Sequence, residues 1–125
     1  MNGLAIGGRT MESILDSIKK LLLLSEDDTS FDTDIIIHIN TVLAILTQLG
    51  VGPENGFTIT DRSATWDQFM GDNPKLDSVI SFVYLKIKLV FDPPTNSAVL
   101  ESMNRTIGEL EWRINVAAEE IQKNS

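Results

Sequence analysis

The sequence predicts an all-α protein, a small bundle of four main helices with a long C-terminal helix and one long, partly structured loop. Two apolar helical patterns meet at Asp92-Pro93-Pro94, where the double proline must separate them. The second pattern repeats apolar residues at alternating gaps of three and four, which is typical of a helix that packs along its length against another helix. These residues are Leu100, Met103, Ile107, Leu110, Ile114, Ala117 and Ile121.

Composition predicts one domain that does not depend on disulfides or membranes. The 125 residues suffice for a single core, and 42% of them are hydrophobic and 22% charged. There is no cysteine, and the net charge of -8 disfavours binding to phosphate backbones. No apolar run reaches the roughly 18 residues of a membrane helix. We expect residues 1–10 to be a flexible extension or an expression remnant, and residues 11–125 to form the helical domain.

The first two helices are predicted on either side of an acidic segment. The first runs from about residue 11 to 24, and the SEDDTS segment at 25–30 ends it. The second begins at 31–33, where Asp32 and Asp34 suit a helix N-terminus, and ends at a capping Gly50. The expected buried face of the first helix consists of Ile14, Leu15, Ile18, Leu21 and Leu22. That of the second consists of Ile35, Ile39, Val42, Leu46 and Leu49, widened by Ile36 and Leu43.

Residues 50–73 form the one long irregular segment. Phe57–Thr60 alternate like a short strand, and Thr65 to Gln68 read as a capping box that opens a one-turn helix stopped by Gly71. A loop of this length in a small domain is usually functional, so we expect it to form a contact surface. Its apolar anchors, which argue that much of it packs down, are Phe57, Ile59, Trp66, Phe69 and Met70.

The last two helices carry the longest apolar patterns. The third is predicted from Asp72-Asn73-Pro74 to about Phe91, and it should be central because it is apolar on most sides. Its seam consists of Leu76, Ile80, Val83, Ile87 and Val90, widened by Val79, Phe82 and Phe91. The fourth should run from about 96 to 122, supported by i,i+4 charge pairs. These pairs are Glu101/Arg105, Glu109/Arg113 and Glu119/Lys123.

No residue pattern indicates catalytic, cofactor or metal chemistry, so we expect no enzyme activity and no cofactor. His38 is the only histidine, and its place in a helical pattern favours a solvent-facing or boundary position. The acidic run between Glu26 and Asp34 resembles a calcium loop but lacks the central glycine and the terminal glutamate of an EF-hand. Solvation and helix capping account for these carboxylates better.

Trp112 is the best candidate for a protein contact. It lies off the apolar seam of the last helix, one turn after the small and poorly helix-forming Gly108. Tryptophan is enriched in interface hot spots, although a helix buried on two sides within one subunit would place it equally well. The full set of candidate interface residues is Phe57, Ile59, Trp66, Phe69, Arg105, Gly108 and Trp112.

The chain resembles the small head–tail connector proteins of tailed bacteriophages, also called head-completion or adaptor proteins. The likeness covers about residues 11 to 121 and lies in the combination and order of five segments. These are ILDSIKKLLL, SFDTDIIIHINTVLAILTQLGVGP, TWDQFMGDN, VYLKIKLVFDPPT and SMNRTIGELEWRINVAAE.

The resemblance implies a structural subunit of the virion, made in the bacterial host cytoplasm and placed at the head–tail junction. Such subunits form a ring, usually dodecameric, that docks on the portal protein and receives a stopper or tail-completion protein. DNA passes through the ring without specific binding, and no membrane, enzyme activity or cofactor is involved. The alternative from the sequence is a small helical adaptor or regulatory protein that binds a single protein partner.

Overall fold

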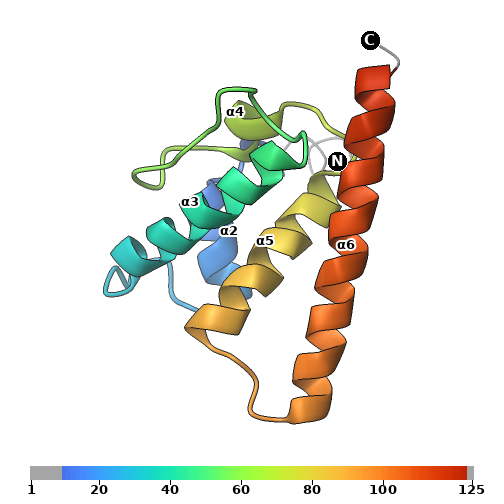
Figure 1. Cartoon of the computed structure of the whole chain (residues 1–125). Coiled ribbons are helices and arrows are strands. Elements are labelled where there is room, and N and C mark those ends of the chain that lie inside the picture. The colour runs from blue at the N-terminus through green and yellow to red at the C-terminus, as the bar shows by residue number, and fades with distance from the viewer. Residues whose placement is uncertain (1–9, 124–125) are drawn as a thin grey trace, which may run out of the picture.

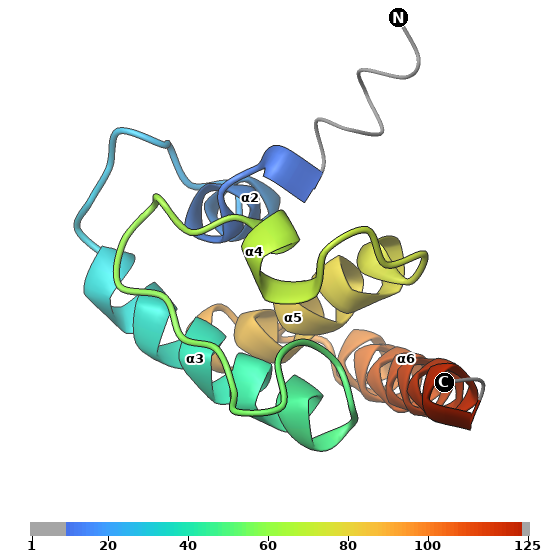
Figure 2. The same ribbon diagram turned by 90° about the horizontal axis from the view of Figure 1, so that it is seen from above.

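The structure is a computed structural model that describes residues 10–123, and the expected N-terminal extension lies almost wholly outside this range. Within the described range the chain is all-α, with no strand, as predicted (Figure 1). In both views α5 lies between α3 and α6, and Figure 2 shows α2 to one side of the α3 and α5 pair. The helices are α2 (Ile14–Leu21), α3 (Asp32–Gln48), α4 (Trp66–Met70), α5 (Leu76–Phe91) and α6 (Ser97–Lys123).

Helix α5 is the centre of the core, as its sequence predicts. It packs against α2, α3 and α6, so it buries side chains around most of its circumference. Its buried residues are Leu76, Val79, Ile80, Phe82, Val83 and Ile87. The predicted seam is wrong at Val90, which is 62% exposed, whereas the next residue, Phe91, packs edge to face on Phe31 with ring centroids 5.4 Å apart.

The first helix is shorter than predicted at both ends. It begins at Ile14, because the Ser13 side chain caps it by accepting a hydrogen bond from the Asp16 backbone N–H. It ends at Leu21, because Leu23 adopts a left-handed conformation with φ of 65°. The backbone N–H groups of Leu23 and Leu24 then bond to the carbonyls of Lys20 and Lys19, at 3.1 and 2.9 Å. This pair of bonds is the Schellman motif, which stops the helix inside the leucine run.

Helix α3 ends in the same motif, with the predicted glycine in the corresponding position. Gly50 has φ of 92°, and the N–H groups of Gly50 and Val51 bond to the carbonyls of Thr47 and Leu46. At the other end the capping prediction is wrong, because no side chain caps the N-terminus of α3. The Asp32 carboxylate pairs with Lys19 instead, at 2.9 Å.

The long loop packs onto α2 and α3 without forming the predicted strand. The Asn40 side chain bonds to both the N–H and the C=O of Ile59, at 2.8 and 3.0 Å, and so replaces the missing strand partner. The capping box at Thr65 and Gln68 is confirmed, and α4 ends at Gly71, whose φ is 61°. A Cβ on Gly52 would lie 2.4 Å from the Phe69 ring, so the loop passes too close there for any other residue.

Helix α6 packs against α5 through only part of its predicted seam. Ile107, Ile114 and the unpredicted Ala118 are buried, whereas Leu110 is half-buried and Ile121 is exposed. Ile121 lies near the end of α6, which has 27 residues where α5 has 16. At a rise of about 1.5 Å per residue, α6 must extend well beyond its partner.

Candidate protein-interaction site

Trp112 lies on the outer face of α6 and is 68% exposed, the highest exposure of any aromatic side chain in the described residues. It follows Ile107 by five residues, which places it on the side of the helix away from the buried Ile107 and Ile114. An exposed indole on a surface helix loses most of the favourable free energy that its burial would give. Trp112 is therefore not buried within the subunit, as it would be if α6 were covered on two sides.

Gly108 and two ion pairs surround Trp112 on this face. No atom lies within 4 Å of the position that a Cβ on Gly108 would take, so packing within the subunit does not require a glycine there. Arg105 is 3.9 Å from Glu101, and Arg113 is 3.5 Å from Glu109. These exposed pairs stabilise the helix only slightly. The predicted partner of Glu119 lies at Lys123, whose side chain is outside the described part of the chain.

The loop candidates occupy a different environment from Trp112. The Trp66 side chain is fully buried, and its indole N–H donates a hydrogen bond to the Ser17 hydroxyl at 2.9 Å. Phe69 and Ile59 are also buried, and the half-buried Phe57 ring packs against Phe69 with centroids 5.5 Å apart. These side chains hold the loop onto the core, so a partner cannot touch Ile59, Trp66 or Phe69 in this conformation. An interface role for the loop backbone and its polar residues stays a prediction.

Lys19 is a structural feature that the sequence analysis missed. It is 2% exposed, and its ammonium group lies 2.8 Å from the Asp28 carbonyl oxygen and 3.1 Å from that of Glu26. The third contact is the Asp32 carboxylate, which is otherwise without a hydrogen-bond partner among the described groups. The acidic segment that resembles a calcium loop thus closes around an ammonium group of its own chain. Lys19 lies seven residues before Glu26, and this closeness in sequence was the available indication that the lysine contacts the acidic segment.

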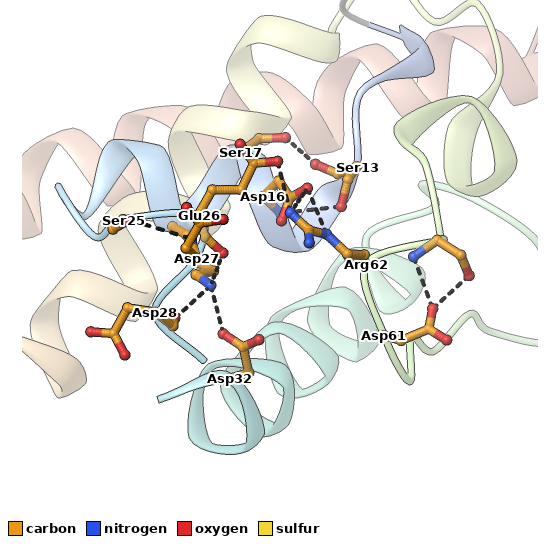
Figure 3. Close-up of polar contacts among 12 residues, drawn as sticks. Ser13, Asp16, Ser17, Ser25, Glu26, Asp27, Asp28, Asp32, Asp61 and Arg62 are labelled. Atoms are coloured by element: carbon orange, nitrogen blue, oxygen red, sulfur yellow. Dashed lines mark hydrogen bonds and ion pairs between the residues drawn. The ribbon is translucent and has the colours of Figure 1, made fainter. Parts of the chain in front are cut away.

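Arg62 connects the long loop to the same corner of the molecule. Its guanidinium bonds to Asp16 at 3.0 Å and to Glu26 at 2.7 Å, as Figure 3 shows. The hydrogen bond to Asp16, with the charges of both carboxylates, raises the pKa of Arg62. Hydrogen bonds from Ser30 lower the pKa of Asp28. The corner between α2 and α3 is therefore held by several polar contacts that cross between segments.

A groove between α3 and α5 was also not predicted. Its volume is about 240 Å³, and exposed Val90 lies at its edge. His38 occupies the boundary position that the sequence predicts, half-buried among the residues that line this groove, which also include Lys86. Only the crossing of two helices creates the groove, so no local pattern could indicate it. Its apolar lining consists of Val42, Ile45, Ile87, Leu89 and Val90.

Neither a metal-binding group nor a membrane span is found in the described part of the chain. No three histidine, aspartate or glutamate side chains of residues 10–123 converge as metal ligands would. None of the helices there has the length and apolar content that crossing a bilayer requires.

Comparison with known proteins gives one match. A family model described as phage connector protein matches residues 14–121, from the first residue of α2 to the last turns of α6. No curated protein sequence and no solved structure matches the chain.

Proposed function

Because the chain belongs to the phage connector protein family, we propose that it is a subunit of the head–tail connector ring. Family membership gives the chain a structural role in the phage particle. In the proposal, copies of the chain form a ring that docks on the portal protein, extends the DNA channel toward the tail and receives the stopper or tail-completion protein. The ring, the portal contact and the channel are the parts that experiment must test.

The exposed Trp112 on α6 is the observation that supports assembly most directly. Burying an aromatic side chain removes about 150–250 Å² of surface from water, and tryptophans at the centre of interfaces often contribute ~2 kcal/mol or more. The charged residues around Trp112 would form the polar rim that surrounds such an anchor. Gly108, one turn earlier, leaves space for a neighbouring backbone.

The acidic character of the chain supports a role beside moving DNA. Its net charge is -8, so a ring of such subunits is strongly negative. Proteins that hold DNA do so by neutralising phosphates with lysine and arginine. A negative channel wall lacks this attraction, and DNA can pass without being retained.

Electron microscopy of the protein mixed with the portal protein of the same phage tests the proposal. We expect a ring of additional density on the tail-facing side of the portal. A tight complex of one subunit with a single partner and no ring would favour the adaptor alternative. Absence of any portal complex would refute the proposed function.

The variant Trp112→Ala tests the assembly surface. We expect it to weaken ring formation on the portal by ~2 kcal/mol per contact, about thirtyfold for each contact, while its thermal unfolding stays close to that of the wild type. Val99→Ala is the matched control, because Val99 is also an exposed apolar residue of α6. If Trp112→Ala assembles like the control, the interface lies elsewhere.

A further inference from the structure

Leu23 combines the highest exposure among the large apolar side chains of the described residues with an unfavourable backbone. Its side chain is 92% exposed, and its φ is 65°. In the described part of the chain it is the one residue other than glycine with positive φ. The Cβ of any residue other than glycine raises the free energy of the left-handed conformation, and a leucine exposed to water regains none of this cost by burial. A glycine would therefore suit the backbone of the isolated subunit better.

The end of α3 has a glycine at the position where α2 has Leu23. Gly50 occupies the position in the Schellman motif of α3 that Leu23 occupies in that of α2. The two motifs have the same hydrogen-bond pattern, so glycine would complete the turn after α2 equally well. Residues that keep an unfavourable conformation commonly serve a function, and what Leu23 has that a glycine would lack is its exposed side chain.

The polar contacts around Lys19 give Leu23 a firm support. The Leu24 N–H bonds to the Lys19 carbonyl, and the Lys19 ammonium bonds to the Glu26 and Asp28 carbonyls further along the same loop. Because both sides of Leu23 are held, its side chain projects from a preorganised turn. An anchor of this kind loses little conformational entropy when it docks.

The groove between α3 and α5 has the size and polarity to receive such an anchor. At about 240 Å³ it is smaller than the ~300–1,000 Å³ typical of small-molecule sites, so it suits one or two side chains. Its lining is mainly apolar and includes one cationic side chain, that of Lys86. The loop beside Leu23 carries the exposed Asp27 and Asp28, and its Glu26 is already paired with Arg62. The carboxylates of Asp27 and Asp28 are complementary in charge to the Lys86 ammonium.

We propose that Leu23 of one subunit docks in the α3–α5 groove of a second copy of this chain. The proposal rests on the proposed ring and names the two surfaces that meet in it. Leu23 follows α2, whereas the groove is lined by α3 and α5 alone, so the two surfaces are different patches of the subunit. A contact between different patches is heterologous, which is the type of contact that a ring of identical subunits requires.

Disulfide trapping between single-cysteine variants tests this contact, because the natural chain contains no cysteine. Leu23→Cys is mixed with Val90→Cys, which places the second thiol at the edge of the groove. We expect this pair to cross-link several-fold faster than either variant with itself, both at high concentration and on the portal. Val99→Cys provides the control position on an exposed part of α6. If Leu23→Cys reacts with Val99→Cys as fast as with Val90→Cys, the proposal is wrong.

Leu23→Gly supplies an independent test, with Leu23→Met as the conservative variant that keeps an apolar side chain. We expect Leu23→Gly to raise the unfolding midpoint of the isolated subunit and to reduce ring assembly on the portal at least tenfold, whereas Leu23→Met assembles. Normal assembly of Leu23→Gly would overturn the contact while leaving the proposed ring intact. Failure of the wild type to form rings on the portal would instead refute the proposed function, and this inference with it.

Discussion

Replacing Lys19 by methionine should destabilise the subunit more than any other change to a charged residue. Methionine keeps an apolar side chain of similar length, so the change removes mainly the ammonium group. Three contacts disappear: those to the Glu26 and Asp28 carbonyls and the 2.9 Å ion pair with Asp32. The acceptors remain, and the buried Asp32 carboxylate oxygen is left without a partner.

The expected cost follows from the burial of these groups. Breaking a buried ion pair by removing one partner costs ~3–5 kcal/mol, because the other charge stays buried. Asp32 is 24% exposed and regains some water, so we expect the lower end of this range, about 3 kcal/mol. For a domain of this size such a loss lowers the melting temperature by roughly 10–15 °C.

Urea denaturation followed by circular dichroism measures this free energy, and Lys20→Met is the matched control. Lys20 is the neighbouring residue on the same helix and is exposed, so its replacement should change stability by less than ~0.5 kcal/mol. A double-mutant cycle with Asp32→Asn isolates the ion pair, and the double variant should lose less than the sum of the single ones. A loss below ~1 kcal/mol for Lys19→Met would refute the reasoning, since it would mean that water already reaches the ammonium group.

Two further predictions concern the core and the acidic loop. Ile114→Ala should cost ~2–5 kcal/mol in a denaturant melt, whereas Leu110→Ala should cost less than Ile114→Ala because Leu110 is only half-buried; equal losses would contradict the packing of α6. In an NMR titration the Asp28 carboxyl should have a pKa below its usual value of 3.8, and Ser30→Ala should raise it. Because the folded pKa is the lower one, the stabilisation is present above pH 3.8 and is lost as the pH falls through the folded pKa; an Asp28 that titrates at 3.8 would contradict it.

Apolar periodicity was enough to predict most of the fold, because burial on a helix face leaves a pattern within a few residues. The patterns of α3 and α6 gave their positions to within two residues, and that of α5 gave its end at Phe91, whereas α5 begins at Leu76, after the predicted start at Asp72-Asn73-Pro74. The errors occur where a contact with a residue elsewhere in the chain determines the local backbone conformation. The predicted strand at residues 57–60 failed because Asn40, 19 residues away, satisfies the Ile59 backbone. The first helix ends early because its last leucines close a turn.

Exposure of the candidate interface residues could be predicted only where the helix itself fixes the direction of a side chain. The position of Trp112 off the apolar seam of α6 indicates a side chain that points away from the core, and in the structure this side chain is exposed. In the loop, length and composition do not tell which side chains point inward, and Trp66 proves to be a core residue. The groove between α3 and α5 depends on how two helices cross, so it has no local sequence signal.

The small size of the exposed contact features predicts that the proposed assembly depends on the portal. One leucine, one tryptophan and a small groove offer little buried area compared with the ~1,200–2,000 Å² of a stable complex. Two free subunits joined through them would therefore separate readily. If the proposed ring is right, a portal that holds subunits side by side would raise the effective concentration of these contacts, and closure of the ring would add one more contact without further loss of freedom. We therefore expect cross-linking between positions 23 and 90 to be faster on the portal than in solution at equal protein concentration.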